Sequence, residues 1–239
     1  MARYYDTEAI VLRSIRLREA DRVVHLYTNA RGRIGAVAKG VRRTRSRFGG
    51  RLEPFFRLNL VLYEGRGELH TVTQAETVES YRGLRERGAS LSAAVGACES
   101  VLRLFHDGES NSGAYNLLCR ELQLLDAEPE AAGAANLLAF RLKLLLAAGF
   151  LPELETCANC GAGSPLASFS AAAGGVLCGD CHVGDAFPLG AAAHSFMASA
   201  LGSPLQEAPA LEGRALAQVD RAVTGTLEYH AHVRLRSVA

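Results

Sequence analysis

Apolar and polar residues alternate along much of the first eighty positions of the chain. In residues 56–62 the side chains of Phe56, Leu58, Leu60 and Leu62 fall on one face of an extended segment, which is the pattern of a half-buried strand. Four further runs rich in strand-forming residues predict strands at 9–12, 23–27, 34–38 and 69–73. No helical pattern long enough to connect parallel strands separates these runs. We therefore expect a small antiparallel barrel, and the five-stranded OB-fold fits the number of strands.

From about residue 82 the apolar residues recur at steps of three and four, which is typical of one face of a helix. This spacing predicts two helices, one with Leu91, Val95, Cys98, Leu102 and Phe105 on its apolar face and one with Tyr115, Leu118, Cys119, Leu122 and Leu125. A third helix is expected over 131–148, because Gly149 followed by Pro152 is a stop signal. Two more helices are expected near 191–200 and 211–230.

A change of composition separates the third helix from the last two. Residues 156–188 are rich in Gly, Ala and Ser, have little periodicity and contain four cysteines. We therefore expect an α+β, multidomain protein. Its parts are an N-terminal OB-fold barrel over 1–80, a helical domain over 81–155, an inserted four-cysteine zinc finger over 156–188, and C-terminal helices over 189–239 that complete the helical domain.

The sequence carries no sign of export or of a membrane anchor. No apolar signal segment follows Met1, and the most apolar long stretch, 131–150, contains Arg141 and Lys143. We therefore expect a cytoplasmic protein with no membrane partner. In that compartment paired cysteines are more often metal ligands or redox groups than structural disulfides.

The four cysteines form two C-x2-C pairs separated by seventeen residues, Cys157 with Cys160 and Cys178 with Cys181. Two such pairs at this separation can place four thiolates tetrahedrally around zinc, so we expect one structural Zn²⁺ per chain. Iron is an alternative metal. A second alternative is a pair of redox-active dithiols, although that chemistry is expected in a βαβ setting rather than in a Gly/Ala-rich segment.

The net charge of +1 hides an uneven distribution. Residues 1–80 hold fifteen basic and nine acidic groups, a net +6, whereas residues 81–239 hold eleven basic and sixteen acidic groups, a net −5. A basic half of a chain favours a polyanionic partner. The segment Lys39–Arg51 contains six cations and no acid, and the pair Gly49-Gly50 predicts a flexible loop.

This basic segment is the candidate nucleic-acid contact. Guanidinium groups pair with phosphates in bidentate geometry, and the ring of Phe48 offers a surface for a base to stack on. Nothing in the segment resembles a code for reading bases, so we expect contacts with phosphates and weak sequence preference. No phosphate-binding loop, H-E-x-x-H or G-x-S-x-G motif is present, which favours a binding protein without catalytic residues over an enzyme.

Four segments of the first eighty residues carry a family resemblance: Glu8–Leu12, Arg18–Arg22, Ala38–Arg43 and Leu52–Phe55. Their order and spacing, followed by a helical middle and a four-cysteine finger, resemble the bacterial DNA repair and recombination family RecO. The resemblance implies an N-terminal OB-fold, a helical domain and a zinc finger, without catalytic turnover of a small substrate. Because some members of the family lack the complete cysteine set, it also implies that the metal stabilises the fold.

The resemblance implies a function and partners as well. Members of the family bind single- and double-stranded DNA, anneal complementary strands and work with RecR, and together they help to load RecA onto DNA coated by single-stranded DNA-binding protein. A nucleoid-associated location in the cytoplasm follows. The matched residues Lys39, Arg42 and Arg43 are then the candidate DNA contacts, and Arg45 and Arg47 extend the set on charge alone.

Two other functions remain open at this point. The chain could be a protein–protein adaptor, whose zinc module and acidic helices bind proteins while the basic segment touches DNA incidentally. Less favoured is a thiol–disulfide oxidoreductase that uses the two C-x2-C pairs.

Overall fold

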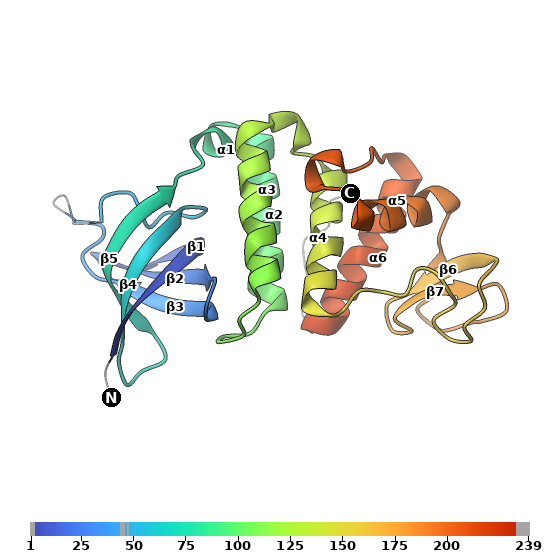
Figure 1. Cartoon of the computed structure of the whole chain (residues 1–239), viewed down its shortest axis with the longest axis horizontal. Coiled ribbons are helices and arrows are strands. Elements are labelled where there is room, and N and C mark those ends of the chain that lie inside the picture. Colours follow the sequence, from blue (N-terminus) through green and yellow to red (C-terminus); the bar gives the residue numbers. More distant parts are fainter. Residues whose placement is uncertain (1–2, 44–45, 47, 233–239) are drawn as a thin grey trace. The chain divides into compact units, whose positions relative to one another are not determined.

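The computed structural model describes residues 3–43, 46 and 48–232 (Figure 1). The chain divides into two compact units, Met1–Ala127 and Glu128–Ala239. The first holds a five-stranded sheet followed by helices, and the second holds the remaining helices and a small three-stranded sheet. Among the described residues, no helix is both long and apolar enough to cross a bilayer.

Five strands form the sheet of the first unit, as the sequence predicts: β1 (Arg3–Leu17), β2 (Asp21–Thr28), β3 (Gly32–Ala38), β4 (Arg57–Glu64) and β5 (His70–Glu79). They are hydrogen-bonded in the order β1-β2-β3-β5-β4, and the sheet closes into a barrel. Four seams are antiparallel, whereas β3 and β5 pair in parallel. The expectation of a wholly antiparallel barrel is wrong at this seam. Five strands in a closed ring cannot all alternate in direction, so one neighbouring pair has to be parallel.

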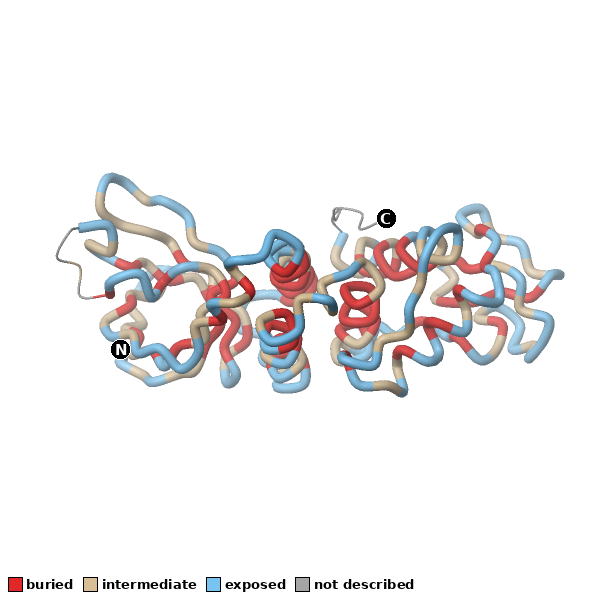
Figure 2. The backbone as a smooth tube through the Cα atoms, turned by 90° about the horizontal axis from the view of Figure 1, so that it is seen from above, coloured by how far each residue is buried: buried red, intermediate tan, exposed pale blue. Residues whose placement is uncertain are grey.

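Alternating side chains of the strands fill the barrel. In β3 the residues Ile34, Ala36 and Ala38 are buried and the residues between them are partly exposed. The predicted alternation of β4 is also present, with Leu58 and Leu60 in the core. Figure 2 shows buried positions, in red, interspersed with more exposed ones along the chain. Each fully buried leucine stabilises the fold by roughly 1.5–3 kcal/mol through the hydrophobic effect.

The helices of the first unit are α1 (Arg82–Glu86), α2 (Gly88–Leu104) and α3 (Ser112–Ala127). Tyr27 of β2 packs against the rings of Phe105 and Tyr115, with centroids 5.4 and 6.4 Å away. The Tyr115 hydroxyl donates a hydrogen bond to the carboxylate of Glu8 on β1 at 2.7 Å, and Arg57 of β4 donates to the same carboxylate at 2.7 Å. Aromatic packing and a charged hydrogen-bond network thus join helix and barrel.

Replacing Glu8 with Gln should reduce the loss of stability in acid. Burial raises the pKa of Glu8, but hydrogen bonds from Arg57 and Tyr115 outweigh that effect and hold the pKa below its ordinary value. A carboxylate with a depressed folded-state pKa stabilises the fold above its unfolded pKa, and this stabilisation is lost as the pH falls through the folded value. In urea titrations at pH 7 and pH 3, we expect the native protein to lose about 1 kcal/mol more than Glu8→Gln.

The exposed Glu19 provides the matched control for this measurement, because the Glu19→Gln variant removes the same ionisable group from the same barrel. It should follow the native protein at both pH values. Equal acid losses in the native protein and in Glu8→Gln would contradict the assignment.

The second unit contains the helices α4 (Ala134–Ala148), α5 (Ala191–Gly202) and α6 (Gly213–Ala231), with short 3-10 helices at Pro129–Ala131 and Leu205–Glu207. The predicted stop signal ends α4, where Gly149 adopts a φ of 78° and donates its N–H to the carbonyls of the last turn. Between the helices, the guanidinium of Arg141 donates to the hydroxyl of Thr224 at 3.0 Å and lies 3.9 Å from the carboxylate of Asp220.

The cysteine-rich segment is more ordered than its sequence suggests. It contains β6 (Leu166–Ser170), β7 (Gly175–Cys178) and β8 (Phe187–Pro188), paired in the order β7-β6-β8. These strands are too short to produce a detectable period in the sequence. Gln218 of α6 donates to the carbonyl of Pro188 at 2.8 Å, and the guanidinium of Arg221 lies 4.0 Å from the centre of the Phe187 ring. The small sheet is therefore attached to the helices of its own unit.

Candidate nucleic-acid interface and metal centre

The basic segment leaves the barrel at the end of β3. Lys39 and Arg43 are exposed, on either side of a tight turn at Gly40, whose φ of 68° favours glycine. The N–H of Arg43 donates to the carbonyl of Gly40 at 3.1 Å, and the N–H of Ser46 donates to the carbonyl of Arg43 at 2.9 Å. Consecutive turns thus hold this part of the segment and present two of the predicted cations to solvent.

The turn between β1 and β2 holds the basic segment in place. The carboxylate of Asp21 accepts the N–H of Gly40 at 2.7 Å. Arg42 is bonded twice to the same turn, through its N–H to the carbonyl of Ala20 at 3.0 Å and through its guanidinium to the carbonyl of Glu19 at 2.9 Å. We call these three hydrogen bonds the turn latch. Arg42 is exposed, yet one of its side-chain donors serves the protein itself.

The other residues of this segment that were expected to contact nucleic acid are Arg45, Arg47 and Phe48. Arg45 and Arg47 lie outside the described residues. Phe48 is only 1% exposed and packs in the barrel core with Leu52, so the expectation that its ring stacks on a base is wrong. The pair Gly49-Gly50 predicts a flexible loop, whereas the ring of Phe48 beside it lies inside the barrel.

Further cations lie on the strands beside the latch, and sequence reasoning missed them. Arg13, Arg16 and Arg18 are exposed on β1 and on the turn that follows it. Arg13 lies opposite His25 of β2, and burial lowers the pKa of His25, as do the charges of Arg13 and Arg33. The available signal was the presence of three arginines in the six residues that follow the predicted strand at 9–12, and only the register with β2 shows that β1 extends through Leu17.

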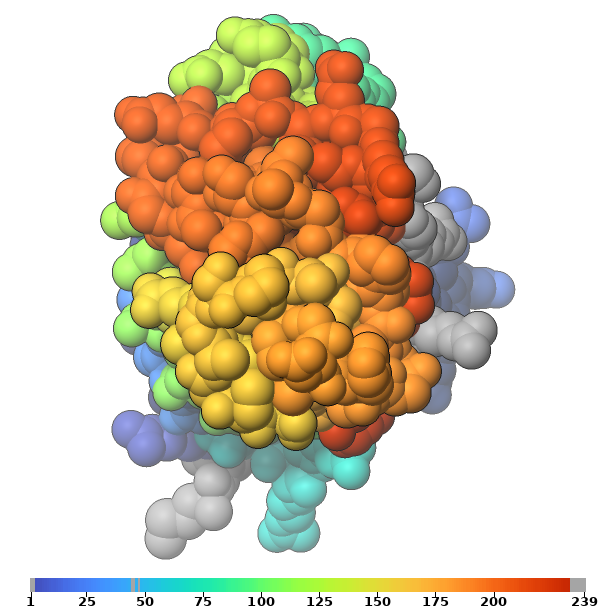
Figure 3. All heavy atoms as spheres, turned by 90° about the vertical axis from the view of Figure 1, so that its right-hand side faces the viewer, coloured from blue at the N-terminus to red at the C-terminus, as the bar shows by residue number. Residues whose placement is uncertain are grey.

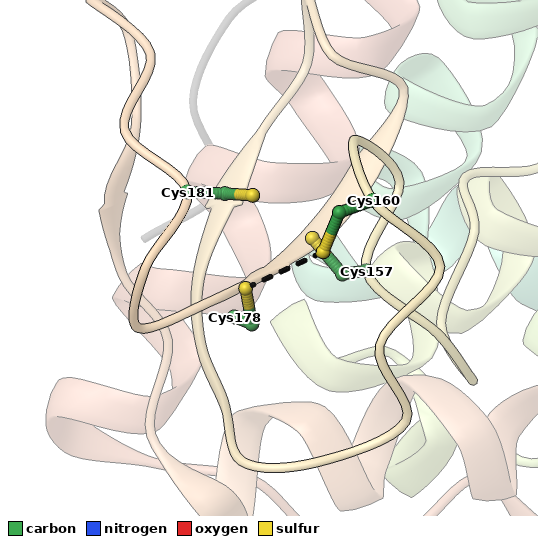
Figure 4. A group of neighbouring side chains, drawn as sticks. All are labelled: Cys157, Cys160, Cys178 and Cys181. Carbon is green, nitrogen blue, oxygen red and sulfur yellow. Dashed lines mark hydrogen bonds between the residues drawn. The ribbon is translucent and has the colours of Figure 1, made fainter.

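The four cysteines come together, as their spacing predicts. Cys157 and Cys160 precede β6, Cys178 ends β7 and Cys181 follows it (Figure 4). All four sulfur atoms lie within 4.8 Å of one another, and the sulfurs of Cys160 and Cys178 are 3.7 Å apart. Sulfurs bound to zinc at about 2.3 Å in a tetrahedron are roughly 3.8 Å apart, so the cluster has the dimensions of a tetrahedral thiolate site.

The backbone around the cluster favours thiolates. The N–H of Cys178 is the largest influence lowering the pKa of Cys157 to about 6, and the N–H groups of Cys160 and Asn159 act in the same direction. Asn159 also donates its side-chain amide to the sulfur of Cys181 at 3.3 Å, which lowers that pKa, but the neighbouring sulfurs outweigh it and raise the pKa to about 12. Four such close sulfurs ionise together only when a cation neutralises them.

A small apolar cluster supports the sulfurs. Leu177 is buried between Cys157 and Cys178, and small side chains such as Ala158 and Ala162 pack around them. In Figure 3 the yellow and orange residues of this segment form one continuous rounded surface. The segment has few large apolar side chains, so its order depends on whatever holds the four sulfurs together.

Comparison with known proteins shows which family the chain belongs to. A family model described as "Recombination protein O N terminal" matches residues 1–81, and one described as "Recombination protein O C terminal" matches residues 85–239. The chain belongs to the RecO family. A protein of Rubrobacter xylanophilus called DNA repair protein RecO is 42% identical over 224 residues, covering 92% of this chain and 88% of its own length. One of Streptomyces griseus with the same name is 38% identical over 238 residues, covering 97% and 96%.

The resemblance to RecO found in four short segments is thereby confirmed. Two of those segments, Arg18–Arg22 and Ala38–Arg43, are the ones that meet in the turn latch. The distance between them in this sequence corresponds to the length of a hairpin, from the β1–β2 turn through β2 and β3 to the end of β3.

Proposed function

We propose that this RecO-family protein acts in DNA repair by binding single- and double-stranded DNA on the basic side of its barrel. The observation that carries the proposal is that Lys39 and Arg43 of the latched segment are exposed next to the β1–β2 turn, where Arg16 and Arg18 are exposed as well. These cations come from sequence-distant segments that are joined by hydrogen bonds, which is how a protein builds a surface for a phosphate backbone.

The strand order supports assigning the barrel to the OB-fold, whose second and third strands and adjoining loops bind oligonucleotides in other proteins. The two family models meet between residues 81 and 85, which supports a DNA-binding domain over 1–80. We retain the helical domain at 81–155, the finger at 156–188 and the C-terminal helices at 189–239 as functional parts of the chain.

Strand annealing follows from charge without covalent chemistry. Two complementary strands repel each other, and a surface that binds phosphates through Arg and Lys lowers that repulsion while the bases pair. We therefore propose a mediator rather than an enzyme, which anneals strands and, with RecR, helps to load RecA onto DNA covered by single-stranded DNA-binding protein. The work would take place at the nucleoid in the cytoplasm.

The metal in this proposal is one structural zinc held by Cys157, Cys160, Cys178 and Cys181. The gathering of all four sulfurs in one cluster supports a single metal site over two separate dithiols. Because four sulfur ligands leave no open coordination position, the zinc would stabilise the finger and take no part in DNA chemistry.

Reversing the charges of the exposed residues Lys39 and Arg43 should weaken DNA binding. In the double variant Lys39→Glu with Arg43→Glu, affinity for a single-stranded oligonucleotide at moderate salt should fall roughly tenfold to a hundredfold. With about five phosphate contacts, log affinity of the native protein should fall against log salt with a slope near −4, and the variant should have a slope smaller by about two. Fluorescence anisotropy at several salt concentrations and an annealing assay provide the measurements.

The matched control carries the same charge change elsewhere in the first unit. Arg103 on α2 and Arg120 on α3 are exposed, and Arg103→Glu with Arg120→Glu should keep most of the affinity. Unchanged binding in the Lys39/Arg43 variant, or an equal loss in the control, would move the DNA site away from the basic segment.

A further inference from the structure

Asp21 is an acidic residue in the middle of a basic surface. It lies at the start of β2 opposite Leu17, which stands between the exposed Arg16 and Arg18 in the chain, and it is hydrogen-bonded to Gly40, which lies between the exposed Lys39 and Arg43. On charge alone an aspartate in this place weakens the attraction for a polyanion. Its carboxylate accepts the N–H of Gly40 at 2.7 Å, and among the described residues this is the one hydrogen bond that the Asp21 side chain makes.

We propose that Asp21 and Arg42 are positioning residues for DNA binding, which act by holding Lys39 and Arg43 in place through the turn latch. This inference rests on the proposed function. Asp21 fixes the turn at Gly40, between Lys39 and Arg43, and Arg42 ties the following residue to the carbonyls of Glu19 and Ala20. In this proposal Arg42 serves the binding surface from within the protein, in place of its expected role as a phosphate contact.

The geometry explains why a latch is needed at this point. A turn with positive φ at glycine has access to many conformations when it is unsupported, and binding then requires that this freedom be lost. A charged acceptor on a backbone N–H is a strong hydrogen bond, and it restricts the turn before DNA arrives. At its far end the segment is held again, because Arg22 pairs with Glu53 at 3.1 Å and donates to Ser14 at 3.1 Å. Lys39 and Arg43 lie in the part held by the turn latch.

The sign of the effect distinguishes positioning from simple electrostatics. In Asp21→Ala a negative charge is removed from the basic surface, so charge alone predicts tighter binding of a single-stranded oligonucleotide. Loss of the latch predicts weaker binding, by roughly threefold to tenfold at moderate salt. Asp21→Asn removes the charge but keeps an oxygen that accepts the Gly40 N–H, so it should bind at least as tightly as the native protein.

Glu19→Ala is the matched control for charge. It removes a negative charge two residues away, and among the described residues its carboxylate makes no hydrogen bond or ion pair, since Arg42 uses its backbone carbonyl. Binding should stay unchanged or become slightly tighter. If Asp21→Ala binds as tightly as Glu19→Ala, the positioning role is overturned, whether or not the DNA site itself is correctly placed.

Arg42 is tested by the salt dependence. Arg43→Gln removes a phosphate contact and should reduce the slope of log affinity against log salt by about one. Arg42→Gln should lower affinity by a similar factor with little change in slope, because a positioning residue releases no counterion of its own. In the double variant Asp21→Ala with Arg42→Gln, the loss of affinity should be smaller than the product of the two single losses, since both substitutions remove hydrogen bonds of the same latch. The proposal would be overturned if Arg42→Gln lowered the slope of log affinity against log salt by one, or if the two substitutions reduced affinity independently.

Hydrogen exchange tests the latch without DNA. The amides of Gly40 and Arg42 should exchange faster in Asp21→Ala than in the native protein or in Asp21→Asn, while the amides of β2 and β3 keep their protection. The exchange result does not depend on DNA binding. If the Lys39→Glu with Arg43→Glu variant binds DNA as well as the native protein, the proposed DNA site is wrong, and the turn latch then holds the basic segment without a role in binding. If the Asp21→Ala barrel does not fold, as measured by thermal melting, the Arg42→Gln slope and the Asp21→Asn affinity still decide the question.

Discussion

The Cys157→Ser variant should lose the proposed zinc and the order of residues 153–188, while the barrel of the first unit stays folded. Zinc bound to short peptides of this kind contributes on the order of 10–16 kcal/mol of apparent binding free energy, which is the free energy that folds them. The apolar cluster that contains the sulfurs is small: among the described residues its one fully buried large side chain is Leu177, whereas Phe169 and Val176 of the same segment are buried outside it.

Two measurements test whether Cys157→Ser loses the metal and the order of the segment. Metal analysis of the purified native protein should give one zinc per chain and a value well below one for the variant. Hydrogen exchange should show rapid exchange of β6 and β7 in the variant, with β1 to β5 unaffected. Cys119→Ser, at a half-buried position on α3 of the other unit, is the control and should keep both the metal and the exchange pattern. Full zinc occupancy with unchanged melting of Cys157→Ser would remove this residue from the ligand set.

Replacing Asp220 with Ala should destabilise the second unit by about 3–5 kcal/mol, since it removes one partner of a buried ion pair. The Arg141 guanidinium is 1% exposed and Asp220 is 6% exposed, so water does not compensate for the lost carboxylate. Thr224 is involved as well, because its hydroxyl donates to Asp220 at 2.9 Å while it accepts from Arg141. The variant thus leaves a buried cation with a weakened network around it.

Urea unfolding of the full chain, followed by hydrogen exchange of α4 and α6, provides the measurement for Asp220→Ala. The double variant Arg141→Met with Asp220→Leu removes both charges and should recover much of the stability, because a well-packed apolar pair often replaces a buried ion pair without loss. Arg214→Ala, at an exposed position on the same helix, should change the free energy of unfolding by less than about 0.5 kcal/mol. A single-variant loss below 1 kcal/mol would show that the charge pair is dispensable.

Local patterns were sufficient to predict the barrel strands, the longer helices and the cysteine cluster, but not α1 or the short strands β6 to β8. Alternation located β4, and runs rich in strand-forming residues located the other four barrel strands. Steps of three and four located α2 and α3, because burial on one side of a helix imposes that period on the sequence. The two C-x2-C pairs were informative for a similar reason: ligand spacing within a short knuckle is a local property. The boundaries were less accurate, since β1 extends to fifteen residues where the apolar run suggested four.

Features that depend on distant partners could not be predicted. The parallel β3–β5 seam follows from closure of the barrel, and closure leaves no mark in either strand. Phe48 has the neighbours of an exposed loop residue, and only the return of the chain over the barrel buries it. The Asp21–Gly40 bond joins positions nineteen residues apart, and an aspartate before a strand gives no indication of which amide it accepts.

The double pairing of β1 sets the order in which the barrel is completed during synthesis. Residues 3–10 of β1 pair with β4, and residues 9–17 pair with β2. The hairpin partner β2 leaves the ribosome almost at once, but the partner of the first half, residues 57–64, is made about fifty residues later. For that interval the edge of β1 is open to pairing with another chain. Its exposed charges, Arg3 and Asp6 among them, are the kind of residues that discourage such pairing in an unfinished sheet.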